Sequence, residues 1–175
     1  MRKEYGAALR ELFTENFLRV CPFFVPVKKA STSAGVPGER AFCWRVSETL
    51  HMWVIVVPHQ KAEAFTIEIG WSRKGRFPHL AMRPSFVPQS DAGLHDEYLC
   101  RLGDLSRGGD WWWSIEELPL NATQDEMMAY IIAQTKPLPP EVARARVTPH
   151  VQEAVGEFER FGLPFLRTHA QPGAS

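Results

Sequence analysis

The sequence has no long apolar segment, and this absence excludes one class of protein. Its longest unbroken apolar run extends from Met52 to Val57, whereas a helix that crosses a bilayer needs ~20 apolar residues. Near the amino end, charged residues such as Arg10 and Glu11 interrupt every stretch that could form the apolar part of a secretory signal, which is about 7–15 residues long. We therefore predict a cytoplasmic protein with no membrane partner.

The sequence also lacks net charge. Its 20 Lys and Arg residues and its 20 Asp and Glu residues give a formal charge of +0. Because no overall charge draws the molecule to the phosphates of nucleic acid, we do not expect a nucleic-acid partner. A chain of 175 residues, 45% of them hydrophobic, is typical of one folded domain. We predict a single domain over 1–175, with 170–175 as a disordered tail.

Cysteine is scarce, and the common catalytic motifs are missing. Cys21, Cys43 and Cys100 are odd in number and lie far apart among apolar neighbours, which predicts buried, reduced thiols. The six histidines include no pair three or four positions apart, the spacing with which one helix holds a metal ion. The sequence contains no phosphate-binding glycine loop and no nucleophile elbow. We expect no metal site and no cofactor, assign no catalytic residue, and favour a protein without enzymatic activity.

Both ends of the sequence have the periodicity of helices. Apolar residues recur every three or four positions over 2–20, which predicts an amphipathic helix. Thr123 followed by Glu126 forms a capping-box pattern at the start of a second helix. A last helix is predicted to begin with Thr148 as its N-cap and Pro149 in its first turn.

Between these helices the sequence has the period of two that is typical of strands. Residues 42–47 and 65–72 alternate in character, 52–57 are apolar on both faces, and 98–102 and 111–115 are shorter candidates. The gaps between the first three strands are too short for a parallel crossover. We predict an α+β fold with a largely antiparallel sheet of about five strands, and with an N-terminal helix and two C-terminal helices packed on one face.

Two features between the strands are candidates for a partner-binding surface. The first is a triplet of tryptophans. Because successive side chains of a strand point to opposite faces, at least one indole must point away from the core that receives its neighbours. The second is a long loop over 73–97 that combines basic and aromatic residues, which suit an acidic partner protein. Packing of the indoles in the core and a plain solvated loop are the structural alternatives. The candidate residues are Trp111, Trp112, Trp113, Arg73, Arg76, Phe77 and Arg83.

The polar face of the strand over 65–72 offers an alternative site. Glu68 lies on that face, and Arg45 and Arg101 lie on strands that could be its neighbours. A carboxylate between two guanidinium groups could line a small-molecule pocket. The structural alternative is a solvated ion pair across strands.

Several short segments, taken in order, carry a resemblance to a known group of proteins. They are Phe42-Cys43-Trp44-Arg45, the run from Phe65 to Trp71, the run from Trp112 to Ile115, and the run from Gly162 to Leu166. Placed behind an N-terminal amphipathic helix, they resemble a small bacterial α+β family of unknown function, some relatives of which are suspected toxin-immunity proteins. The resemblance implies a compact α+β fold and a protein partner, and it transfers no catalytic residue.

These observations lead to two hypotheses for function. We favour a non-catalytic protein-binding module, with an immunity-like protein that occludes a partner as its most concrete form. The alternative is a small-molecule binding protein or an enzyme that uses a pocket on the polar sheet face. The first hypothesis predicts an exposed aromatic patch, and the second predicts a concave surface with convergent polar groups.

Overall fold

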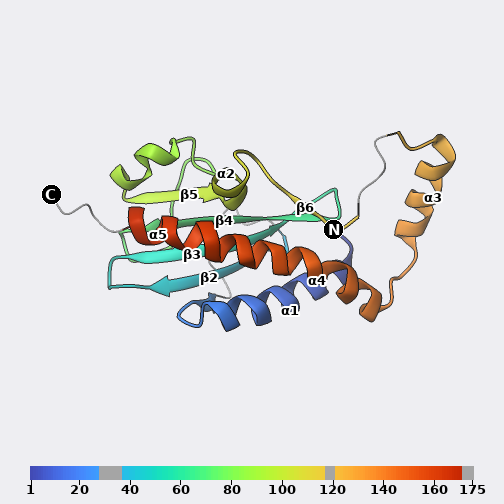
Figure 1. Ribbon diagram of the computed structural model, residues 1–175, viewed down its shortest axis with the longest axis horizontal. Helices are drawn as coiled ribbons and strands as arrows, with labels where there is room; N and C mark the ends of the chain where they lie inside the picture. The colour runs from blue at the N-terminus through green and yellow to red at the C-terminus, as the bar shows by residue number, and fades with distance from the viewer. Residues whose placement is uncertain (28–36, 117–120, 171–175) are drawn as a thin grey trace.

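Figure 1 shows the computed structural model of the protein, which describes residues 1–27, 37–116 and 121–170. Within these ranges six strands form one antiparallel sheet in the spatial order β1-β2-β3-β4-β5, and β6 also pairs with β4. The strands are β1 (Val25–Val27), β2 (Arg40–Arg45), β3 (His51–Pro58), β4 (Ala64–Ser72), β5 (Glu97–Arg101) and β6 (Trp113–Ser114). Strands β5 and β6 pair with successive parts of the same edge of β4.

Helices cover one face of the sheet (Figure 1). α1 (Lys3–Val20) and α4 (Pro140–Glu157) lie side by side on this face. α4 continues through the π-helical turn η2 (Phe158–Gly162) into α5 (Leu163–His169). Two short helices, η1 (Gln89–Leu94) and α2 (Leu102–Ser106), lie on either side of β5 along the chain. The antiparallel sheet with its N-terminal and C-terminal helices confirms the predicted α+β fold.

One helix stands away from the rest of the molecule. α3 (Gln124–Thr135) lies apart from the sheet and from the other helices, beyond the end of α1 and α4 (Figure 1). Its start is the predicted one, because Thr123 and Glu126 exchange hydrogen bonds as a capping box. The described part of the chain therefore divides into a sheet with its packed helices and a separate helical arm.

The last long helix begins earlier than the sequence predicts. α4 starts at Pro140, so Pro149 lies inside the helix and Thr148 is not its N-cap. The Thr148 hydroxyl instead donates a hydrogen bond to the carbonyl oxygen of Arg144, 2.7 Å away, one turn earlier. A proline in a helix removes one backbone hydrogen bond, but here Val147 and Val151 on either side are fully buried. Their packing on the sheet keeps the helix continuous.

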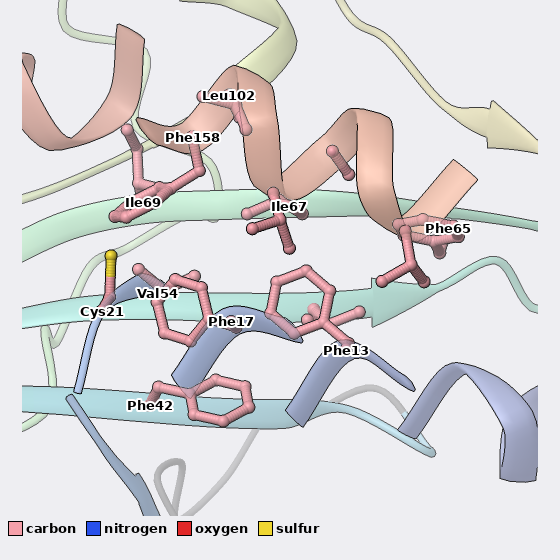
Figure 2. Packing of buried hydrophobic residues seen from close by; sticks show 14 of the residues in the cluster. Phe13, Phe17, Cys21, Phe42, Val54, Phe65, Ile67, Ile69, Leu102 and Phe158 are labelled. Atoms are coloured by element: carbon pink, nitrogen blue, oxygen red, sulfur yellow. The ribbon is translucent and has the colours of Figure 1, made fainter. Parts of the chain in front are cut away.

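The larger hydrophobic core lies between the sheet and its helices. Figure 2 shows Phe13 and Phe17 of α1 against Phe42 of β2, with Phe158 on the opposite side of the same core. The rings of Phe17 and Phe42 are 4.9 Å apart between centroids, and those of Phe17 and Phe158 are 5.2 Å apart. Fully burying one such side chain stabilises a fold by about 1.5–3 kcal/mol. This cluster packs α1 and η2, the turn that follows α4, against the strands.

A second, smaller core lies on the other face of the sheet. Trp53 and Ile55 of β3 pack there with Leu99 of β5, and Phe77 and Leu80 from the loop between β4 and β5 cover them. The rings of Phe77 and Trp53 meet edge to face at 5.0 Å. Every residue of β4 is therefore buried, including the positions that alternation alone predicts to face water. The long loop acts here as a cover for the sheet.

None of the helices in the described ranges is long and apolar enough to cross a membrane. The end of the predicted tail, 171–175, lies outside those ranges. Ala170, at the end of α5, is buried.

Candidate functional site

The second face of the sheet contains a hollow of about 410 Å³. We call it the sheet-face hollow. Three strands contribute to it: the end of β3, the centre of β4 and the end of β5. The loop over 73–96, which we call the cover loop, and Trp112 of the tryptophan triplet complete it. Its lining residues are Val57, Pro58, His59, Gln60, Lys61, Glu68, Arg83, Arg101 and Trp112. The hollow therefore combines two of the predicted pocket residues, Glu68 and Arg101, with two of the predicted partner-binding residues, Arg83 and Trp112.

Glu68 is the buried centre of this arrangement. Its carboxylate lies 2.7 Å from the Arg83 guanidinium, which the cover loop brings over the strand. Glu39 accepts two further hydrogen bonds from the same guanidinium, at 3.2 and 3.4 Å. One arginine thus ties the loop to a carboxylate on β4 and to another just before β2.

The charged residues of this cluster shift one another's pKa values. Burial raises the pKa of Glu68, and this effect is larger than the lowering by the nearby Arg83 charge. Burial lowers the pKa of Arg83, but the attraction of Glu68 and Glu39 leaves it above its ordinary value. Arg83 therefore stays charged at any physiological pH, and its contacts favour a structural role for Glu68 as the anchor of the cover loop.

Arg101 is the direct neighbour of Glu68 across strands. Its guanidinium forms an ion pair with Asp110 and lies 5.0 Å from the centre of the Trp112 ring, a distance at which a cation is attracted to the face of an indole. Its buried Nε has no hydrogen-bond partner. Arg101 thus contacts the tryptophan triplet through Trp112 and keeps one buried donor without a partner.

Arg45 does not take part in the sheet-face hollow. It lies opposite His51 on β3, whereas Glu68 lies opposite Ile55. His51 and Ile55 are four residues apart, which corresponds to ~13 Å along a strand. Arg45 is exposed at that end of β2, so the structure brings together Glu68 and Arg101 but not the third residue of the predicted pocket.

The three tryptophans occupy three different environments. Trp113 is buried and stacks on Phe65 of β4 with 5.5 Å between ring centroids. Trp112 is half-buried and meets the His59 ring edge to face at 4.8 Å. Trp111 is 38% exposed and has the Arg107 guanidinium 4.0 Å from its ring centre. The strand here is only two residues long, so strict alternation does not apply to the triplet.

The basic loop residues already have partners within the protein. Arg73 donates hydrogen bonds to the carbonyl oxygens of Gly93, His169 and Ala170. Arg76 pairs with Glu97 at 3.2 Å. Arg83 is held by two carboxylates, so all three arginines have partners within the protein and fix the loop and the C-terminal helix. Of the three, Arg76 is the most exposed, with half of its side chain in solvent.

The lining of the sheet-face hollow contains no hydroxyl or thiol nucleophile, because no Ser, Thr or Cys is among the residues that surround it. Burial raises the pKa of Cys43 to about 11 and raises that of Cys100 as well, so both thiols are poor nucleophiles. In the described ranges no group of three or more His, Cys, Asp or Glu side chains could hold a metal ion.

One helix carries a group of exposed apolar residues that the sequence analysis did not single out. Met127, Met128, Ile131 and Ile132 of α3 are between 44 and 56% exposed. At 3.6 residues per turn they fall within about 140° of the helix circumference, so they form one face. We call these four residues the α3 face. Their spacing is visible in the sequence, but apolar spacing does not reveal whether a helix packs on its own domain.

Comparisons of this chain with models of known protein families, with curated protein sequences and with solved structures found no match.

Proposed function

We propose that this protein is a non-catalytic, protein-binding module and that α3 is the element that contacts the partner. The observation that carries this proposal is the α3 face. α3 stands away from the sheet (Figure 1), and its four large apolar side chains are between 44 and 56% exposed. Single exposed apolar residues are common on protein surfaces, but a contiguous group of them marks an interaction site. An amphipathic helix of this kind binds in an apolar groove of its partner.

The charges of α3 indicate the chemistry of the partner. Residues 121–135 include Asp125 and Glu126 and contain no Lys or Arg. The helix is therefore apolar on one face and negative at its start. The complementary surface is an apolar groove with basic side chains at its rim. The proposal commits to a separate protein with such a groove, and an immunity-like protein that occludes a partner toxin is one class that works in this way.

The role of the tryptophan triplet and the basic loop follows from their contacts. Arg73 and Arg83 are held by groups of the same chain, and Phe77 packs on Trp53. These side chains support a stable body, and Trp111 and Arg76 are the members of the predicted surface with substantial exposure. We therefore place the main contact on α3 and not on the loop.

The test compares partner capture by three forms of the full chain. Ile131→Glu places a charge in the centre of the α3 face, and Leu94→Glu is the matched control, because Leu94 is 82% exposed on η1. Each protein is immobilised and incubated with lysate of its source, and retained proteins are identified and then purified for affinity measurement. We expect one partner that the wild type and Leu94→Glu bind equally and that Ile131→Glu binds at least tenfold more weakly.

Two results contradict the proposal. One is a partner whose affinity is the same for all three forms. The other is self-association of the purified wild type, measured by analytical ultracentrifugation, that Ile131→Glu abolishes, because the α3 face would then be covered by a second copy of the chain.

A further inference from the structure

A second hollow, of about 290 Å³, lies on the helix-covered face of the sheet, between α1 and the strands β2 and β3. We call it the α1 hollow. Its apolar wall is formed by Leu9 and Phe13 of α1, Phe42 of β2 and Val56 of β3, all of which are buried. Figure 2 shows Phe13 and Phe42 close together at this end of the core. The volume is just below the range for small-molecule sites, which is ~300–1,000 Å³, and suits a small ligand.

The polar part of the α1 hollow is positive. Lys3 and Arg10 reach it from α1, and Arg40 reaches it from β2. Arg2 also contributes to the lining, but Glu63 pairs with it at 3.8 Å. No Asp or Glu is among the lining residues.

Unlike Arg2, the other two arginines of this hollow, Arg10 and Arg40, have no counter-ion among the described residues. The ion pairs of the described chain involve neither Arg10 nor Arg40. Glu39, next to Arg40 in sequence, is bound by Arg83 on the opposite face of the sheet. Burial and the nearby charge of Arg10 lower the pKa of Arg40, as expected for two cations that share one site without an anion.

A glycine keeps one side of the α1 hollow open. Gly6 lies in the first turns of α1 and lines the hollow, and a Cβ added to it would meet no atom within 4 Å. Glycine is among the weakest helix formers, so a larger residue would suit the helix better. Its lack of a side chain leaves this part of the hollow's lining unobstructed.

We infer that the α1 hollow binds a small carboxylic acid with a short apolar chain. The carboxylate would lie between Arg10 and Arg40, because a guanidinium group matches the two oxygens of a carboxylate with parallel hydrogen bonds. The chain would lie on Leu9, Phe13 and Phe42. This inference is independent of the proposed function, since α3 does not contribute to the hollow.

Isothermal titration calorimetry with sodium octanoate tests the inference on the full chain. Sodium acetate supplies the carboxylate without the chain, and 1-octanol supplies the chain without the carboxylate. We expect octanoate to bind at one site at least tenfold more tightly than either fragment. Absence of octanoate binding, or equal binding of octanoate and octanol, overturns the inference.

Two pairs of variants locate the binding site. Gly6→Leu fills the α1 hollow without removing a charge, and Gly156→Leu is its matched control, because a Cβ at this exposed position of α4 also meets nothing within 4 Å. Arg40→Gln removes one cation of the hollow, and Arg160→Gln removes an exposed cation from η2. We expect Gly6→Leu to abolish octanoate binding and Arg40→Gln to weaken it at least tenfold, with both controls unchanged. Equal affinity in a variant and its control overturns the assignment of the site.

Discussion

The Arg83 guanidinium lies 2.7 Å from the buried carboxylate of Glu68 and also binds Glu39. Arg83 belongs to the loop between β4 and β5, whereas Glu68 lies in the centre of β4. This contact explains why a long segment without regular strands covers one face of the sheet. The sequence presents Arg83 and Glu68 as candidates for function, but the ion pair between them has a structural role.

Removing Arg83 should destabilise the fold strongly. Arg83→Met leaves Glu68 and Glu39 close together, with 6 and 10% of their side chains exposed, and breaking a buried ion pair in this way costs about 3–5 kcal/mol. Urea unfolding of the wild type and the variant at pH 8 measures the difference. Arg76→Met is the control, because half of the Arg76 side chain is exposed and surface pairs contribute only about 0–1 kcal/mol. Equal losses for the two variants would contradict the structural role of Arg83.

The loss of unfolding free energy in Arg83→Met should depend on pH. Burial raises the pKa of Glu68 even beside Arg83, and without the arginine the lowering by its charge is lost. A folded-state pKa above the unfolded one means that protonation favours the folded chain. The deficit of Arg83→Met relative to wild type should therefore be largest at pH 8 and become smaller toward pH 5. If the difference in unfolding free energy between the two proteins is the same from pH 5 to pH 8, the pKa of Glu68 is not raised as described.

Replacing the buried tryptophan of the triplet should destabilise the fold more than replacing the exposed one. Trp113 is 1% exposed and stacked on Phe65, whereas Trp111 is 38% exposed. Trp113→Ala should cost about 3–5 kcal/mol of unfolding free energy. Trp111→Ala should cost clearly less than this, because more than a third of the Trp111 side chain is already in solvent. Thermal and denaturant unfolding of the two variants measure this order, and a reversed order would contradict the placement of the two indoles.

The cysteines should react slowly. Burial raises the pKa of Cys21 and of Cys43 to about 11, so at pH 8 roughly one such thiol in a thousand is a thiolate. A disulfide reagent such as dithionitrobenzoate should label neither thiol in the native protein within minutes and should label all three cysteines in urea. Rapid labelling of a native thiol would mean that the cores around it open readily.

Arg40 should lower the stability of the free protein. Burial and the charge of Arg10 disfavour its protonated form in the folded state, and this form predominates at pH 7. Arg40→Gln should therefore raise the free energy of unfolding by a few tenths of a kcal/mol, as the removal of a like-charge neighbour does, while it weakens octanoate binding. A more stable protein with a weaker site is the pattern that a binding site produces. A loss of stability would point to a structural role for Arg40.

The predicted and observed folds agree where one local pattern decides the structure. The helix predicted over 2–20 is α1 at Lys3–Val20, and the alternation of residues 65–72 corresponds to β4. Antiparallel pairing followed from short connections alone. The start of α4 was missed because Pro149 is a typical first-turn residue, and the burial of Val147 and Val151 that carries the helix through it is a tertiary effect.

The candidate sites were less predictable, because they depend on long-range contacts. The polar alternation of β4 predicted a solvent-facing side, but Thr66 and Ser72 are fully buried there. Nothing in the pattern of residues 65–72 reveals that the following loop folds back over them. Likewise, the apolar residues at 127–132 predict an amphipathic helix whether or not it packs on the sheet. Only the three-dimensional arrangement separates the α3 face from the core (Figure 1).

Site-specific photo-crosslinking tests the central claim most directly. A photoreactive phenylalanine analogue is incorporated in place of Ile131 on α3 or, as a control, in place of Leu94 on η1. Each protein is then irradiated in cells of its source. We predict a cross-link to one other protein from position 131 and none to that protein from position 94. A cross-link from position 131 only to a second copy of the chain, or to no protein at all, would contradict the assignment of α3 as the partner-binding element.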